Sequence, residues 1–245
     1  MCNGRDAAKA CGTPVLEAQL RDDRLAIEAG PKEGKGERKM NRMQIEEGKS
    51  RILWTRQSPE LRRELERSGK YRVKQEYLEK KNGNMSVYYD RLYRWYTRAA
   101  SRILDTGGAP YPIWFNLTED RMLQPVKGSE ILAVELPAEA YLLCNYEAWG
   151  YVVNYFYVAL SREDEERHRA ELRKNGLKSD DELFLTEKGN FYPILKREVE
   201  KSWERIFTLR PDDTERGVAA TSWELRSEWI REVRSYEKGA LDGPE

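Results

Sequence analysis

Large apolar side chains are concentrated in the middle of the chain, and both ends are charged and poor in them. Because a core needs a dense set of apolar residues, this pattern predicts one globular domain over residues 50–208. Residues 1–49 show no clean hydrophobic period and are expected to be a disordered or loosely helical tail. Residues 209–245 are predicted to be a polar tail with one amphipathic helix, because four apolar residues recur there at helical spacing: Leu225, Trp229, Val233 and Tyr236.

The first tail carries a second expectation. The run from Gly34 to Met40 could be encoded by purine-rich codons that resemble a bacterial ribosome-binding site just before a start codon. We therefore expect translation to begin at Met40 or Met43, and the preceding residues to be a translated leader.

Within residues 50–208, short apolar or alternating runs predict strands, and apolar residues at helical spacing predict helices. The expected strands are residues 51–57, 71–74, 111–117, 131–136, 141–145 and 155–160. The expected helices are residues 58–69, a long aromatic-rich helix over 86–104, a short one over 146–153, a charged one that ends near Gly176, and a last one through Leu195 and Ile206. This order predicts an α+β fold with one mixed, mostly antiparallel sheet and flanking helices.

Charge and composition narrow the function classes. Lys plus Arg and Asp plus Glu number 43 each, so bulk attraction to nucleic acid or to an anionic membrane is not predicted. No apolar run has the length of a membrane span. The three cysteines show no spacing typical of a disulfide framework or a zinc site, which indicates a reducing compartment. The cytoplasm is therefore the expected compartment. His168, the one histidine, lies in a charged run and is predicted to be solvated, which disfavours a Ser-His-Asp triad and a multi-histidine metal site.

No P-loop, GxGxxG, GxSxG, HExxH or CxxC motif is present, so candidate chemistry must come from local patterns. Thr55, Arg56 and Gln57 end an apolar strand just before a helix, where α/β sheets often bind ligands and where an arginine can hold a phosphate. The alternative is a strand end that exposes its polar residues. Tyr71 and Trp114 could stack against a base or a nicotinamide ring, although aromatic residues at regular spacing also fill cores.

Four further polar residues lie beside apolar runs, and each could line a pocket or point outward from a half-buried strand. They are Asn116, Gln124, Glu135 and Asn154. Glu135 alternates with Val134 and Leu136, so it is expected to face solvent.

Several blocks of sequence resemble a bacterial family called domain of unknown function 3841. They are Ile52 to Pro59, Tyr71 to Lys74, Tyr93 to Tyr96, Tyr111 to Trp114, Trp149 to Asn154 and Lys188 to Pro193. The resemblance runs from about Ile52 to Phe207, leaves both tails outside, and implies no established activity.

The order of elements is also similar to that of DNA-targeting ADP-ribosyltransferase toxins. In such enzymes a residue on the first strand holds NAD, aromatic residues pack the nicotinamide, and a glutamate on a later strand orients the ribose. The resemblance implies that Arg56 holds NAD, that Trp114 or Tyr71 packs its ring, and that Glu135 is the catalytic glutamate. No ExE or QxE pair accompanies Glu135, which is a departure from the pattern.

Three functions remain open. The first is an NAD- or nucleotide-using transferase at the end of the first strand, and the second is a non-catalytic module that binds a ligand, or a protein through the C-terminal helix. The third is a nucleic-acid-binding protein, which balanced charge disfavours. Its basic stripe would be four arginines of the long helix: Arg91, Arg94, Arg98 and Arg102.

Overall fold

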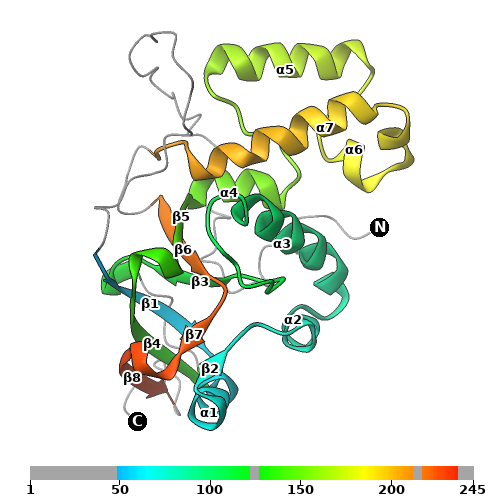
Figure 1. Ribbon diagram of the computed structural model, residues 1–245. Coiled ribbons are helices and arrows are strands. Elements are labelled where there is room, and N and C mark those ends of the chain that lie inside the picture. Colours follow the sequence, from blue (N-terminus) through cyan, green and yellow to red (C-terminus); the bar gives the residue numbers. More distant parts are fainter. Residues whose placement is uncertain (1–48, 122–126, 212–216, 237–245) are drawn as a thin grey trace, which may run out of the picture. The chain divides into compact units, whose positions relative to one another are not determined.

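The computed structural model describes residues 49–121, 127–211 and 217–236 (Figure 1). The expectations for Gln124 and for the first 48 residues, including a start at Met40 or Met43, lie outside the described residues. The chain divides into two compact units. The sheet unit contains the described residues up to Leu143 and from Val218 onward, and the helical unit contains Cys144–Gly217.

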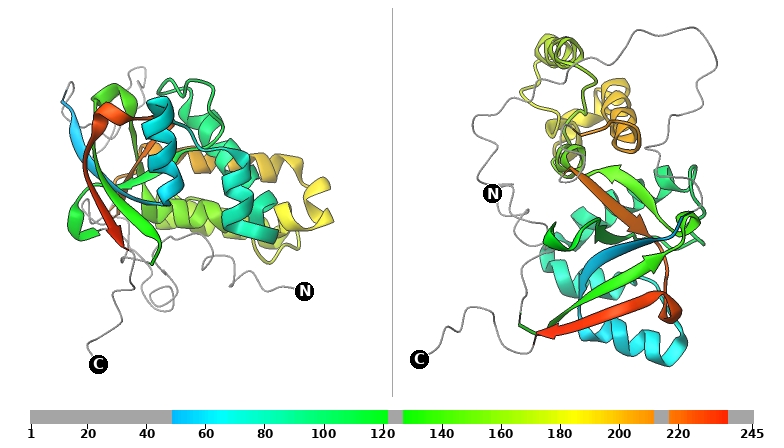
Figure 2. Two further views of the ribbon diagram at one scale, coloured as in Figure 1. Left: turned by 90° about the horizontal axis from the view of Figure 1, so that it is seen from below. Right: turned by 90° about the vertical axis from the view of Figure 1, so that its left-hand side faces the viewer.

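A six-stranded sheet forms the centre of the sheet unit, with the strand order β5-β6-β3-β1-β4-β8. The pairs β1–β3, β1–β4, β3–β6 and β4–β8 are antiparallel, and Figure 2 (right) shows the strands side by side with β8 at one edge. The strands are β1 (Arg51–Gln57), β3 (Ile113–Asn116), β4 (Ser129–Leu136), β5 (Leu142–Asn145), β6 (Val218–Ser222) and β8 (Ile230–Tyr236). The predicted α+β class and mostly antiparallel sheet are confirmed.

One face of this sheet packs on helix α1 (Pro59–Ser68), and we call it the α1 face. Leu61 and Leu65 of the helix join a buried cluster with Leu53 of β1 and with a second sheet, β2 (Lys70–Tyr71) paired to β7 (Leu225–Arg226). The helix follows Ser58 and starts with a proline at its first turn, which suits the fixed backbone angle of that residue. It ends at Gly69, whose φ of 74° is left-handed, as is usual for a glycine at this position.

The opposite face packs on the long aromatic helix, α3 (Ser86–Ala100), and we call it the α3 face. Tyr96 is fully buried, its ring centroid lies 5.3 Å from that of Trp114 in β3, and its hydroxyl is 2.9 Å from the Thr221 hydroxyl in β6. The helix follows α2 (Gln75–Asn82) and the short η2 (Gly83–Met85). The predicted aromatic-rich helix is therefore present and ends four residues earlier than expected.

The helical unit is built from α4 (Tyr146–Val153), α5 (Arg162–Lys174), α6 (Glu182–Leu185), η5 (Glu187–Asn190), α7 (Pro193–Ser202) and η6 (Trp203–Phe207). Its core contains the stacked rings of Tyr155 and Phe184, with the Trp203 ring tilted against both. The strand predicted over residues 155–160 is wrong. Side chains satisfy the backbone there instead of a neighbouring strand: the Tyr157 N–H donates to Asp180 and the Val158 N–H donates to Ser202.

The predicted C-terminal helix is also wrong, because residues 225–236 form β7, the short η7 (Ser227–Trp229) and β8. β6 lies between β5 and β3 in the main sheet, so the globular part does not end at residue 208. The run from Ile230 to Tyr236 fits a helix or a strand equally well, and pairing with the free side of β4 decides for the strand.

His168 was expected to be solvated, and this is wrong. Its side chain lies on the inner side of α5 with 2% of its surface exposed. Its Nε2 is 2.6 Å from Asp180 Oδ1, and its ring stacks on Tyr157 with 3.9 Å between centroids. The contacts with the Asp180 carboxylate and the Tyr157 ring stabilise His168 in a buried position, although the residues around it in the sequence are charged.

Candidate functional site

The strand register brings three of the predicted ligand-binding residues onto the α3 face. Trp54 of β1 lies opposite Asn116 of β3, Arg56 follows Trp54 by two residues in β1, and Trp114 precedes Asn116 by two residues in β3. Opposite residues point to the same side of a sheet, and so do residues two apart along a strand, so these four side chains lie on one face. An arginine, an amide and two indole rings therefore share one surface.

A residue that the sequence did not indicate completes this surface. Ile131 of β4 lies opposite Arg56 on one side and opposite Arg234 of β8 on the other. The Arg234 guanidinium lies 5.3 Å from the centroid of the Trp54 ring, within cation–π distance. We call the resulting set the Arg56 cluster: Trp54, Arg56, Trp114, Asn116 and Arg234.

The two arginines of the cluster differ in their surroundings. Arg234 donates to Glu232, at 2.5 Å, and to Glu119, and these hydrogen bonds raise the pKa of its guanidinium. Burial lowers the pKa of Arg56, because its half-buried guanidinium has lost part of its hydration.

Thr55 and Gln57 alternate with Arg56 and therefore lie on the α1 face. The Thr55 hydroxyl donates to the Trp114 carbonyl oxygen at 2.8 Å, and the Gln57 amide donates to the Thr55 hydroxyl at 2.8 Å. Gln57 lies opposite Glu130, which is buried and accepts from Arg62 of α1 at 3.0 Å. The structure therefore separates these two residues from Arg56 and gives them partners within the sheet.

Tyr71 is also separated from Arg56. It lies in β2, is 6% exposed, and belongs to the buried cluster on the α1 face. Its ring stacks on Tyr77 with 6.1 Å between centroids, and burial raises the pKa of its hydroxyl. Tyr71 is a core residue in this structure.

Glu135 points to the same face as Arg56 but lies at the other end of the strand pair. It is opposite Ile52, whereas Arg56 is opposite Ile131, four residues away along β4. At about 3.4 Å per residue this is roughly 13 Å. Glu135 accepts from Ser50 at 2.5 Å and from Arg231 at 2.7 Å, and these contacts lower the pKa of its half-buried carboxyl.

The arginine stripe of α3 is not a row of four available cations. Arg94 donates to both carboxylate oxygens of Asp90, at 2.8 and 2.9 Å, and to the Tyr111 hydroxyl at 2.9 Å. Burial and the Asp90 carboxylate raise the pKa of Tyr111 to about 12. A guanidinium held by these two partners is poorly placed to neutralise a phosphate.

A charged cluster that sequence reasoning missed lies in the helical unit. The Tyr157 hydroxyl is within 3.2 Å of both Asp164 oxygens and accepts from Arg167 and Arg205. Ser161 caps the start of α5, where its hydroxyl accepts from the Asp164 N–H at 3.2 Å. Arg205 is 41 residues from Asp164 in the sequence, so no local sequence pattern predicts their contact.

Neither a metal centre nor a membrane span is found in the part of the chain that the structure describes. It contains no group of three or more His, Cys, Asp or Glu residues that could hold a metal ion. It also contains no helix with the length and apolarity needed to cross a bilayer.

The family model for a domain of unknown function, DUF3841, matches residues 52–231. The chain belongs to this family. The match passes residue 208 and reaches into β8, in agreement with a sheet that needs its C-terminal strands. No curated protein and no solved structure matches the chain, and no match supports the resemblance to ADP-ribosyltransferase-like folds.

Proposed function

We propose that this DUF3841 protein binds a nucleotide on the α3 face of its sheet, at the Arg56 cluster, with NAD as the first candidate. The observation that carries the proposal is the pairing of Trp54 with Asn116, which puts these two residues on the same face of the sheet as Arg56 and Trp114. Nucleotides combine an anionic phosphate, a flat ring and several hydrogen-bonding groups. Those three features match a guanidinium, an indole surface and an amide.

Each cluster residue has a distinct role in this proposal. Arg56 holds the phosphate, since a guanidinium on a strand is a rigid fork for two phosphate oxygens. Asn116 recognises a polar edge of the ligand, because its amide both donates and accepts. Trp54, with Arg234 over its ring, offers the stacking surface, whereas Trp114 already packs against Tyr96 of α3.

A transferase reaction of ADP-ribosyltransferase type would require a carboxylate beside the ligand. Glu135 lies about 13 Å along the strand from the position opposite Arg56 and is bonded to Arg231, so we assign it to that ion pair and to no step of a reaction. Glu232 lies opposite Ala133 on the α3 face, and it is the carboxylate to test if NAD is consumed.

Isothermal titration of the full chain with NAD, ADP and AMP tests the proposal. We expect Arg56→Ala to weaken binding by about tenfold to a hundredfold, which is the usual loss when a charge-assisted contact is removed. Asn116→Ala should weaken it less. Arg63→Ala is the matched control, because Arg63 is exposed on α1 and away from the α3 face.

Two results would contradict the proposal. The first is the absence of heat with all three nucleotides for the unaltered chain. The second is equal affinity for unaltered chain and Arg56→Ala when both melt at the same temperature. Release of nicotinamide from NAD that Glu232→Gln abolishes would extend the proposal from binding to catalysis.

A further inference from the structure

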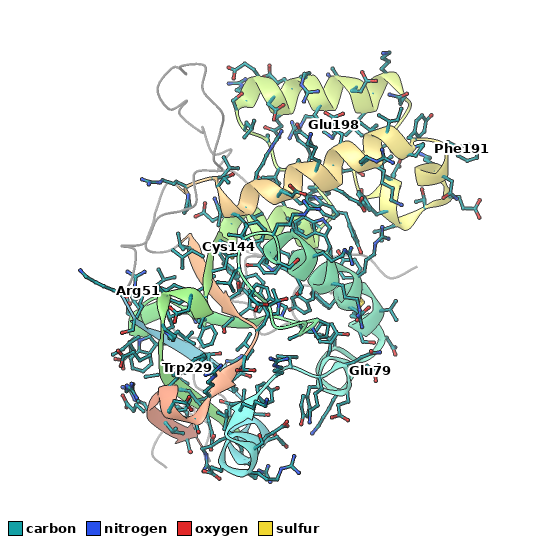
Figure 3. All side chains as sticks on the ribbon, in the orientation of Figure 1. Arg51, Glu79, Cys144, Phe191, Glu198 and Trp229 are labelled. Atoms are coloured by element: carbon teal, nitrogen blue, oxygen red, sulfur yellow. The ribbon has the colours of Figure 1, made fainter. Side chains whose placement is uncertain are left out.

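Three large apolar side chains are exposed at one corner of the helical unit. Leu185 ends α6 with 57% of its surface exposed, Phe191 follows η5 with 77%, and Ile194 lies in the first turn of α7 with 83%. Figure 3 shows Phe191 at the outer end of this unit. Single exposed apolar residues are ordinary, but three within one short stretch mark a contact surface. We call Leu185, Phe191 and Ile194 the apolar corner.

The backbone that carries the apolar corner is tightly built. Gly189 of η5 is buried, and a Cβ there would lie 1.9 Å from the Leu183 carbonyl oxygen, so η5 packs directly on α6. The Tyr192 hydroxyl donates to the Asn175 carbonyl oxygen at 3.0 Å and fixes the start of α7 to the end of α5. The exposed side chains therefore sit on a close-packed frame that holds them outward.

The surroundings of the apolar corner are basic. Residues 173–197 include six Lys or Arg and four Asp or Glu. Of the acidic residues, Asp180 is buried against His168, Glu182 is paired with Lys188, the Asp181 carboxylate accepts from the Ser179 hydroxyl, and Glu187 is exposed. Three exposed cations around the corner form no ion pair with any described residue: Arg173, Lys178 and Arg197.

We propose that the apolar corner docks on an anionic lipid surface. Phe191 and Ile194 are more than three-quarters exposed, and a fluid bilayer accepts such side chains without a matching pocket. The cations beside it would lie at the level of the headgroups, where the negative charge of anionic lipids attracts them. Apolar insertion and charge attraction act together, as stable binding to a membrane surface requires.

Co-sedimentation of the full chain with vesicles tests this inference, using phosphatidylcholine vesicles with and without phosphatidylserine. We expect binding to the vesicles that contain phosphatidylserine and a decrease with added salt. The Phe191→Ser/Ile194→Ser double variant should lower the partition coefficient by at least about tenfold, because it removes two inserting side chains. Arg197→Glu should lower it while leaving the apolar side chains in place.

The chain offers a matched control for the apolar change. Val87 is 80% exposed in the sheet unit, so Val87→Ser removes an equally exposed apolar side chain elsewhere and should leave vesicle binding unchanged. Melting temperatures of all variants check that they fold. The inference is overturned if the unaltered chain stays in the supernatant, if both kinds of vesicle bind it equally, or if Val87→Ser weakens binding as much as the double variant. Self-association that the double variant abolishes would also overturn it, in favour of a second copy of the chain as the partner.

Discussion

The charged cluster around Asp164 predicts how acid destabilises the helical unit. Asp164 accepts from Arg167 at 2.8 Å, from Arg205 at 2.9 Å and from the Leu160 N–H at 2.9 Å. Burial by itself raises the pKa of this carboxyl, but the hydrogen bonds and the Arg205 charge outweigh burial and lower the pKa to about 2. The charged form is thus favoured in the folded protein.

The size of the effect follows from the displacement of this pKa from its reference value of 3.8 to about 2. Each unit corresponds to about 1.4 kcal/mol, so the Asp164 charge contributes roughly 2 kcal/mol to the free energy of unfolding. The carboxyl is 16% exposed, so solvent screens it little. Because the folded pKa is depressed, this contribution is complete above about pH 5 and is lost progressively as the pH falls through 4 and then through 2.

Asp164→Asn removes the charge and keeps the shape, and it should lower the free energy of unfolding by roughly 2 kcal/mol at pH 7. Urea unfolding followed by circular dichroism at pH 7, 4 and 2.5 measures it. The difference from the unaltered chain should shrink at the lowest pH, where the carboxyl begins to be protonated. Glu166→Gln is the control, because its exposed ion pair with Arg162 lies on the same helix and should contribute little. A loss that is equal at all three pH values would refute the electrostatic explanation.

Four further changes test the fold. Gly189→Ala should lower the free energy of unfolding by about 3 kcal/mol or more, because the new Cβ would collide with the Leu183 carbonyl oxygen. Gly150→Ala, at an open helical position of α4, should raise the free energy of unfolding by about 0.5–1 kcal/mol. Thermal melts of the two variants measure both effects. Glu130→Gln should cost about 1–3 kcal/mol, measured by urea unfolding, because the buried carboxylate accepts from Arg62 and Ser235. A chain that ends at residue 208 lacks β6 and β8 and should show no cooperative melt, and a sharp transition would contradict the strand order.

Local patterns were sufficient for the elements whose contacts are close in sequence. The proline and glycine that bound α1 and the aromatic spacing of α3 are readable without the fold. The pairing of strands that are far apart in the chain could not be predicted from local patterns. β6 lies between β3 and β5 in the sheet, although about a hundred residues separate β3 from β6 in the chain. No pattern within residues 218–222 indicates which strands they pair with.

The same distinction explains why only part of the candidate site converged. Thr55, Arg56 and Gln57 were treated as one polar group because they are adjacent in sequence. In a strand, however, adjacent residues point to opposite faces, so Arg56 joined Trp114 and Asn116 while its two neighbours turned toward the α1 face. Sequence alternation alone could have separated them, once the segment was accepted as a strand.

Trp54 and Arg234 illustrate what alternation can and cannot recover. Trp54 is two residues before Arg56, so any strand that presents Arg56 presents Trp54 on the same side. Arg234 reaches that surface only because β8 pairs with β4 and sets it opposite Ile131, which depends on a C-terminal segment that also fits a helix. If Arg234 supports the stacking position of Trp54, then Arg234→Ala should weaken nucleotide binding with little loss of stability, because its other partners, Glu119 and Glu232, are exposed. Equal affinity for the unaltered chain and Arg234→Ala in the same titration would limit the nucleotide site to the residues of β1 and β3.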